Sequence, residues 1–528
     1  MPVMKGTTSW PTRVAWPRAA ESRMAAMPAL LSGGQSHAYR GRSRFVLSPL
    51  SLTLDQLLLL ITAALLCFGL VMVQSADSRV TGLNTHWLEQ SFNNKNAIHA
   101  AIAMFVLCGL WRVDYRWLLG RTGGRHSILV SPATILLVIT ICLLLAVSSP
   151  LGKEINGARR WLALGPLGFQ PSELAKLSLV AFIAAYAVHC RDEIQRFGLG
   201  ILPWVFLVIA AGVWVLTPER AAKINALDGV LTHVSLMTLK LSISGGCAAI
   251  AAGLLSLRVG RTWYWGFLPL LFSAGLCLVL VLTGDFGTTA LIALVVVVML
   301  LMAECRWWHV ALLIPPASLV VYQMLQTPFR RARLFAFQHP WDDPKGAGYH
   351  VIQSLLTIAS GSFAGRGLGN GIQKMGYLPE DNTDFIFAVI CEELGFFGAL
   401  LVVGLFIAFV VIGWRIASRC QHHFGKMVAF GITAMIGLQA AINIAVVTAS
   451  VPTKGIALPL ISSGGTGWIM NAAAIGVLMS IERVNRREAL ANRSVYDSHE
   501  PSLGFPVQVT AVPTVIAIPT APAVPHNN

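Results

Sequence analysis

About twelve apolar runs dominate this chain, and most of them are long enough to cross a lipid bilayer as a helix, which takes about 20 mostly apolar residues. The run at 233–257 is the least typical, because Lys240 lies within it and its centre is rich in glycine, alanine and serine. We therefore expect an all-α polytopic membrane protein. The runs lie at 54–74, 97–113, 127–148, 171–189, 199–216, 233–257, 264–283, 288–303, 308–325, 385–413, 427–449 and 466–481.

Composition agrees with a membrane protein and argues against nucleic-acid binding. Only 12% of the residues are charged, about half the share in soluble domains. The net charge is +15, but the basic residues gather at the ends of apolar runs, where they orient the chain and attract anionic lipids. The nine cysteines are scattered singly, which indicates small apolar residues rather than a disulfide framework.

Basic residues also predict the topology, because cytoplasmic loops are rich in arginine and lysine. They place both termini inside and put loops 75–96, 149–170, 217–232, 326–384 and 450–466 outside. Residues 1–50 are expected to form a disordered basic cytoplasmic tail, and the Pro-rich residues 486–528 a second disordered cytoplasmic tail. Residues 51–485 then form the membrane domain.

The loop at 326–384 is the longest polar interval between apolar runs, and it carries the main candidates for chemistry. Arg330 and Arg333 are three residues apart, so a helix would place them on one face. Farther along, Glu380 and Asp384 precede an apolar helix. Asp384 has two interpretations, a helix cap or a general base at the water–lipid boundary. Acids inside a membrane need partners, so we expect the following pair, Glu392-Glu393, to pair with cations.

Two further outer loops offer cations or anion-binding backbone. Arg159 and Arg160 lie beside an aromatic residue, either as an interfacial anchor or as a site for a phosphate-bearing headgroup. Lys454 lies between a proline and a glycine in the last outer loop. The segment after it holds Ser462, Gly464 and Gly465 before a helix, which suggests either a hinge or backbone N–H groups that bind an anion. Asp285, between two runs, is at least as well explained as a helix cap.

Five segments in order resemble motifs of the SEDS family (shape, elongation, division and sporulation proteins), which includes FtsW and RodA. The segments are NGARRWLALGPLGFQPSELAK, GDFGTT, FRRARLFAFQHPWDDPKGAGYHVIQS, GLGNGIQKMGYLPEDNTDFIFAVICEELGFFG and VPTKGIALPLISSGGTG. Together they cover roughly residues 50–485. The Gln373-Lys374 pair before the YLPE run favours the FtsW branch.

The resemblance implies a peptidoglycan glycosyltransferase with a SEDS-type helical bundle. Such an enzyme polymerises lipid II, the undecaprenyl-diphosphate-linked disaccharide-pentapeptide, into glycan strands at the outer face of the bacterial inner membrane. Its expected partners are a class B penicillin-binding protein and other division proteins at the septum. Asp384 matches the family's essential acid, and Lys454 matches the lysine of its PTKG motif.

The residues suit the reaction that the resemblance implies. A sugar hydroxyl attacks C1 of a second sugar and expels a diphosphate lipid with inversion, so a carboxylate must take a proton and cations must stabilise the leaving group. Asp384 is the nominated base and Glu380 the runner-up. The sequence shows no metal cluster, although a divalent cation, Mg²⁺ or Mn²⁺, is compatible with the family. The other candidate substrate contacts are Arg159, Arg160, Arg330, Arg333, Lys374, Lys454, Ser462, Gly464 and Gly465.

Some features depart from the family pattern. The family generally spans the membrane ten times, which predicts an extra pair of spans at about 199–263. Asn382, Asp381 and Ser463 stand where the family usually has His, Ala and Tyr. Three alternatives stay open: a lipid II flippase or transporter, a RodA-like elongation polymerase, and a scaffold that only recruits division proteins. The lack of an obvious internal repeat counts against a transporter.

Overall fold

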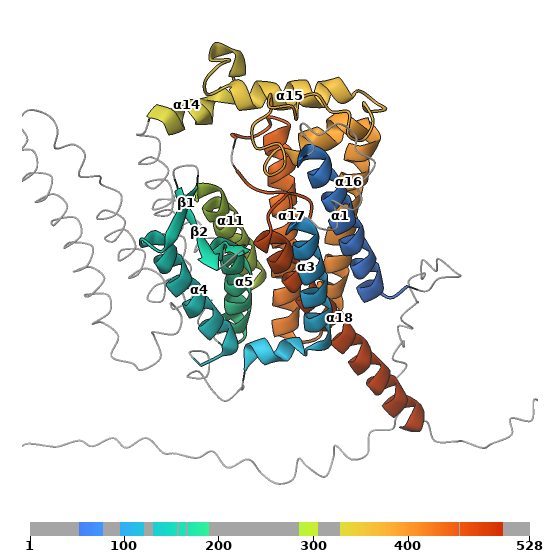
Figure 1. The fold of residues 1–528 in the computed structure, drawn as a ribbon. Coiled ribbons are helices and arrows are strands. Elements are labelled where there is room, and N and C mark those ends of the chain that lie inside the picture. The colour runs from blue at the N-terminus through green and yellow to red at the C-terminus, as the bar shows by residue number, and fades with distance from the viewer. Residues whose placement is uncertain are drawn as a thin grey trace, which may run out of the picture. The chain divides into compact units, whose positions relative to one another are not determined.

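The computed structural model describes residues 52–77, 95–120, 130–155, 158–164, 167–189, 285–304, 328–453 and 455–499. Within these ranges the chain is mainly helical (Figure 1). The helices are α1 (Leu54–Asp77), α3 (Lys95–Arg112), α4 (Pro132–Ser148), α5 (Pro171–His189), α11 (Phe286–Met302), α14 (Pro328–Ala336), α15 (Tyr349–Gly361), α16 (Ile386–Arg419), α17 (His423–Val447) and α18 (Thr466–His499), with short 3-10 turns η1 (Tyr115–Leu119) and η4 (Pro340–Asp342).

The expected apolar runs in the described ranges coincide with α1, α3, α4, α5, α11, α16, α17 and α18. Four described helices are long and apolar enough to cross a membrane, namely Leu54–Ala76, Pro171–His189, Ile386–Arg419 and His423–Val447. The chain is therefore a membrane protein. The expected runs at 199–216, 233–257, 264–283 and 308–325, and with them the extra pair of spans, lie outside the described residues, as does the expected tail at 1–50.

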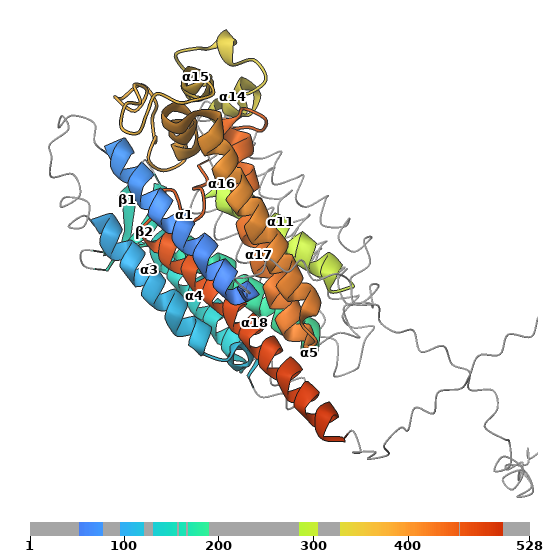
Figure 2. The same cartoon turned by 90° about the vertical axis from the view of Figure 1, so that its right-hand side faces the viewer.

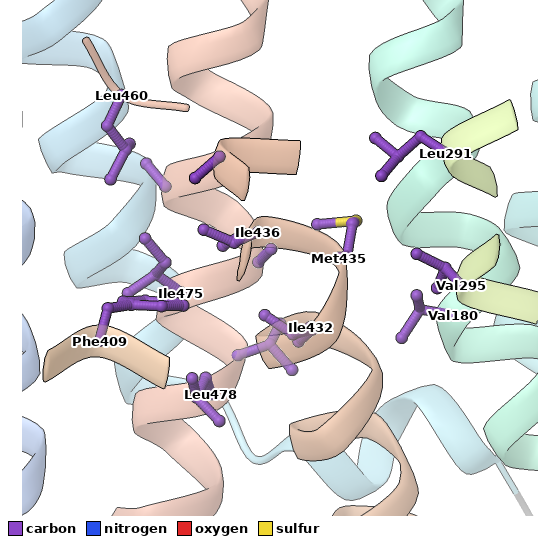
Figure 3. Packing of buried hydrophobic residues seen from close by; sticks show 14 of the residues in the cluster. Val180, Leu291, Val295, Phe409, Ile432, Met435, Ile436, Leu460, Ile475 and Leu478 are labelled. Carbon is purple, nitrogen blue, oxygen red and sulfur yellow. The ribbon is translucent and has the colours of Figure 1, made fainter. Parts of the chain in front are cut away.

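Helix α17 lies at the centre of the packing (Figure 3). It contacts α16 and α18 as well as α5 and α11, so apolar residues on opposite sides of the helix are buried, as expected for a helix surrounded by other helices. Figure 2 shows α1, α3 and α18 side by side, with α18 in contact with both of its neighbours. The labelled core residues are Val180, Leu291, Val295, Phe409, Ile432, Met435, Ile436, Leu460, Ile475 and Leu478.

The all-α expectation needs one correction, because the outer loop at 149–170 contains a small antiparallel sheet. Its strands are β1 (Gly152–Ile155), β2 (Ala158–Leu164) and β3 (Leu167–Phe169), in the order β1-β2-β3. Leu162 pairs with Gly152 on one side and with Phe169 on the other. The physical reason is visible in the sequence, since an Asn-Gly dipeptide between two short extended segments favours a hairpin.

Helix α16 is kinked at Gly395, whose φ is 64°, a conformation that favours glycine. A β-carbon at Gly395 would lie 2.4 Å from the backbone nitrogen of Gly365. The amides of Arg366 and Gly367 donate to the carbonyls of Glu392 and Glu393, both at 2.9 Å. The glycine-rich segment at 361–371 therefore packs backbone against backbone on the kink.

Helix α18 continues to His499, beyond residue 485, where the sequence analysis began the C-terminal tail. Arg486 in this extension forms an ion pair with the buried carboxylate of Asp55, with Nη1 3.2 Å from Oδ1. The pair joins the start of α1 to α18. Residues 500–528 lie outside the described part of the chain.

Candidate functional site

The outer loops at 149–170, 326–384 and 450–466 meet at the end of the bundle that carries the sheet and α15 (Figure 1). The amide of Ser463 donates to the carbonyl of Asn382 at 2.9 Å, which joins the last outer loop to the largest one. The amide of Gln170 donates to Oγ1 of Thr466 at 3.4 Å, which joins the sheet loop to the start of α18. Segments far apart in the sequence thus converge beside Asp384.

A tight turn presents Asp384 just before α16. Glu380 has a φ of 56°, and its carbonyl accepts hydrogen bonds from the amides of Thr383, Asp384 and Phe385 at 3.1–3.2 Å. The N-cap of α16 is Phe385, and no side chain makes a capping hydrogen bond there. The capping interpretation of Asp384 is therefore wrong, and its carboxylate is available for another role.

The last outer loop forms one wall around the Asp384 carboxylate. A β-carbon on Gly455 would lie 2.6 Å from Oδ2 of Asp384. Gly287, at the start of α11, is packed in turn against Ile456 and the carbonyl of Gly455. Asp285 accepts a hydrogen bond from the amide of Thr288 at 3.3 Å, so its interpretation as the cap of α11 is confirmed.

The electrostatic surroundings suit Asp384 to proton transfer near neutral pH. The pKa of Asp384 is raised from its ordinary value of 3.8 to about 7, chiefly because the carboxyl is buried. The carboxylate of Glu380 contributes to this rise, the guanidinium of Arg160 opposes it, and Asp285 adds a smaller increase. A general base works best when its pKa lies near the working pH, so Asp384 has the properties of one.

The two arginines of the sheet differ in their surroundings. Arg160 on β2 is half-buried and acts electrostatically on Asp384. Arg159 is exposed, and its Nε lies 3.6 Å from Oε2 of Glu154 on the neighbouring strand. Successive residues of a strand point to opposite faces, so only one of two adjacent arginines faces the site. Arg160 is thus a predicted cation that the structure brings to Asp384.

Lys374 does not fit the predicted role of a substrate-binding cation. Its side chain is buried, and its Nζ donates to Oε1 of Glu393 at 2.7 Å and to the carbonyl of Ser75 at 2.9 Å. An ammonium held in this way has no exposed surface for a diphosphate. Glu392 has a cationic neighbour in Arg366, with Nε 3.8 Å from Oε1. The expectation that Glu392 and Glu393 pair with cations is confirmed.

The polar residues of the last outer loop hold the loop's own shape. The Ser462 hydroxyl accepts a hydrogen bond from the amide of Leu458, and the Ser462 carbonyl accepts one from Nε1 of Trp468, both at 2.7 Å. Gly465 has a φ of 40°, and a β-carbon there would lie 3.1 Å from Nε2 of His99. Gly464 accepts at its carbonyl from the amide of Gly467 at 2.7 Å.

The structure does not describe the side chains of three of the predicted cations. Lys454 lies outside the described residues. Arg330 and Arg333 belong to the helix α14, but their side chains are not among those described. Glu380, the runner-up base, is exposed and accepts a hydrogen bond from the Thr383 hydroxyl at 2.9 Å. Among the described side chains, no group of three or more His, Cys, Asp or Glu residues is arranged to hold a metal ion.

Two polar residues of α17 that were not predicted also hold the site, through hydrogen bonds to backbone carbonyls. Asn443 donates to the carbonyl of Asp384 at 2.8 Å and to that of Ile456 at 2.7 Å. Gln439, one turn earlier, donates to the carbonyl of Ala457 at 2.8 Å. Their signal was present in the sequence, as two amides four residues apart inside an otherwise apolar run.

Comparisons with known proteins agree on one family. The family profile of FtsW, RodA and SpoVE, described as cell cycle protein, matches residues 55–259 and 240–487. The probable peptidoglycan glycosyltransferase FtsW of Geobacter sulfurreducens is 31% identical over 428 residues, which cover 81% of this chain and 94% of that protein. The protein of the same name from Aliivibrio salmonicida is 33% identical over 457 residues, covering 85% and 91%.

A solved structure shares the fold. It is a chain of a peptidoglycan synthase complex that coordinates polymerization and crosslinking, with a TM-score of 0.54 and 24% identity. The match covers 81% of this chain and 97% of that chain. At this identity, the likeness concerns the arrangement of the helices.

Proposed function

The chain belongs to the FtsW/RodA/SpoVE family of cell cycle proteins, and from this premise we propose that it is a peptidoglycan glycosyltransferase of cell division. Its substrate is lipid II, and its product is a glycan strand still linked to undecaprenyl diphosphate. The work takes place at the outer face of the bacterial inner membrane. Two relatives at 31% and 33% identity carry the name of this activity, which supports the proposal.

The observation that carries the mechanism is the partly buried Asp384, whose pKa is raised to about 7. The carboxylate takes the proton of the acceptor's 4-hydroxyl as the oxygen attacks C1 of the donor sugar. The bond between C1 and the diphosphate oxygen breaks, and the diphosphate leaves with the electron pair. Attack from the face opposite the leaving group inverts the anomeric centre.

The leaving diphosphate requires positive charge, since charge that develops in the transition state must be met by fixed groups. Arg160 is the first candidate, because it already acts on Asp384. Arg159, Arg330, Arg333 and Lys454 stay candidates on their loops, whereas Lys374 is withdrawn because Glu393 holds it. A divalent cation, Mg²⁺ or Mn²⁺, fits as a counter-ion carried by the diphosphate, since Mg²⁺ is commonly bound through substrate phosphates.

The proposal extends to partners and topology. A class B penicillin-binding protein would cross-link the strands, and the shared fold with a chain of a peptidoglycan synthase complex supports such a partnership. Both termini are proposed to be cytoplasmic, and the protein is proposed to act at the septum. An extra pair of spans at about 199–263 is also part of the proposal.

The test is polymerisation of lipid II by the purified protein, with and without a class B penicillin-binding protein. We expect glycan chains from the wild type and none from Asp384→Ala. A flippase or transporter would instead move labelled lipid II across proteoliposomes and make no glycan. A scaffold would do neither. Rescue of cells depleted of either the division or the elongation polymerase separates the FtsW-like role from the RodA-like role.

A further inference from the structure

Asn443 is a buried amide near the C-terminal end of the apolar helix α17. Only 1% of its surface is exposed. Its Nδ2 donates one hydrogen to the carbonyl of Asp384 and the other to the carbonyl of Ile456, at 2.8 and 2.7 Å. Polar groups inside a membrane are costly to bury and are found where they pair. Asn443 therefore joins the residue that carries the proposed base to the loop that faces it.

A second amide holds the same loop one residue farther on. Gln439 lies four positions before Asn443, on the same face of α17, and its Nε2 donates to the carbonyl of Ala457 at 2.8 Å. The Oε1 of Gln439 accepts from Nζ of Lys176 on α5 at 2.7 Å. Lys176 is paired with Oε2 of Glu173 at 2.9 Å. A chain of polar contacts thus runs from α5 through α17 to the last outer loop.

These contacts determine the space around the Asp384 carboxylate. Gly455, which directly precedes the two anchored carbonyls, lies against Oδ2 of Asp384. Asn443 therefore holds both walls of this space, the backbone of Asp384 on one side and the segment after Gly455 on the other. A small displacement of a catalytic group from its productive geometry costs about 100-fold in rate.

We propose that Asn443 is a positioning residue that sets the placement of Asp384 relative to the last outer loop, with Gln439 and Lys176 fixing the other end of the same segment. The inference rests on the proposed function, because it acts through the proposed base. Asn443 contacts neither sugar nor diphosphate in this account. Its loss should lower kcat and leave the KM for lipid II nearly unchanged.

The test uses the full-length protein with lipid II and compares Asn443→Leu with Thr433→Val. Leu has the branched shape of Asn, although it is larger, and it cannot donate a hydrogen bond. Thr433 is a buried polar residue of the same helix that bonds only to the carbonyl of Ala429 among the contacts described. We expect kcat to fall about 100-fold in Asn443→Leu with KM within about threefold, and both constants to stay near the wild-type values in Thr433→Val.

A conservative variant separates positioning from general loss of structure. Asn443→Gln keeps the donors on a longer side chain, and we expect it to recover part of the lost kcat. Where Asn443→Leu does not fold, Gln439→Met carries the same test, with a decrease in kcat of about tenfold. An Asn443→Leu protein that matches Thr433→Val, or that changes KM alone, overturns this inference. Wild-type protein that makes no glycan overturns the proposed function and, with it, the inference.

Discussion

The carboxylate of Asp384 lies so close to Gly455 that a β-carbon at position 455 would be 2.6 Å from Oδ2. The carboxylate of the proposed base is therefore packed against the last outer loop. The two residues are 71 positions apart in the sequence, at 384 and 455. A methyl group at Gly455 would have to push the carboxylate aside, because a carboxylate turns more easily than a backbone moves.

We expect Gly455→Ala to lower the polymerisation rate by about 10–100-fold, since the carboxylate would leave its productive position. The melting temperature should change little, because only the end of a side chain has to move. Initial rates of glycan formation and thermal unfolding in detergent measure the two effects. Gly404→Ala on α16, where a β-carbon meets nothing within 4 Å, is the matched control. Equal rates for both variants would contradict the contact.

The rate of polymerisation should rise with pH through about 7, where the pKa of Asp384 lies. Arg160 lowers this pKa and Glu380 raises it. We therefore expect Arg160→Gln to move the rising limb of the kcat profile to higher pH, and Glu380→Gln to move it to lower pH. Profiles measured with saturating lipid II decide this. Shifts in the same direction for both variants would contradict the assignment.

The same carboxylate should reduce stability as the pH rises. Its pKa is higher in the folded protein than the ordinary value of 3.8, so the folded state binds more protons between pH 3.8 and about 7, and stability falls with rising pH in this window. Asp384→Asn lacks this ionisation. We expect its melting temperature to exceed that of the wild type at pH 8, with a difference that shrinks towards pH 5. A constant difference across this range would be the opposite result.

Lys374 and Glu393 form a buried ion pair. We expect that substitution of Lys374 alone lowers the stability of the protein and that substitution of both partners restores most of it. Removing one partner leaves a buried charge, at a cost of about 3–5 kcal/mol. We expect Lys374→Met to lower the melting temperature strongly and Lys374→Met combined with Glu393→Gln to recover most of the loss. Recovery should be smaller for Lys374→Met combined with Glu392→Gln, because Lys374 is paired with Glu393. Equal recovery in both doubles would show that the pairing is different.

Most of the described helices could be predicted from apolar run length alone, because burial in lipid needs long apolar segments. The kink in α16 could not, since Gly395 looks like any other glycine in a membrane helix until the glycine-rich segment packs against it. The sheet was missed because its strands are short and carry two arginines, which the length of an apolar run does not detect.

The site residues that belong to recognisable motifs could be predicted from the sequence. The residues whose role depends on which partners they are buried with could not. Asp384 stood out as an acid directly before an apolar run, and Arg160 as a cation beside an aromatic residue in the loop 149–170. Lys374 was misjudged because its partner, Glu393, lies in the next helix, and only the fold brings Ser75 beside both. Asn443 and Gln439 form a visible pair of amides on one helix face, but their spacing does not indicate which carbonyls they meet, because those carbonyls belong to a loop that only the fold brings to α17.

The most direct test of the central claim is the rate at which Asp384→Asn polymerises lipid II in the presence of the class B penicillin-binding protein. Asn keeps the size and loses the basic oxygen, so we expect no glycan above background, a loss of at least about 100-fold, while lipid II binding persists. Glycan formation by Asp384→Asn at a rate near that of the wild type would contradict the account.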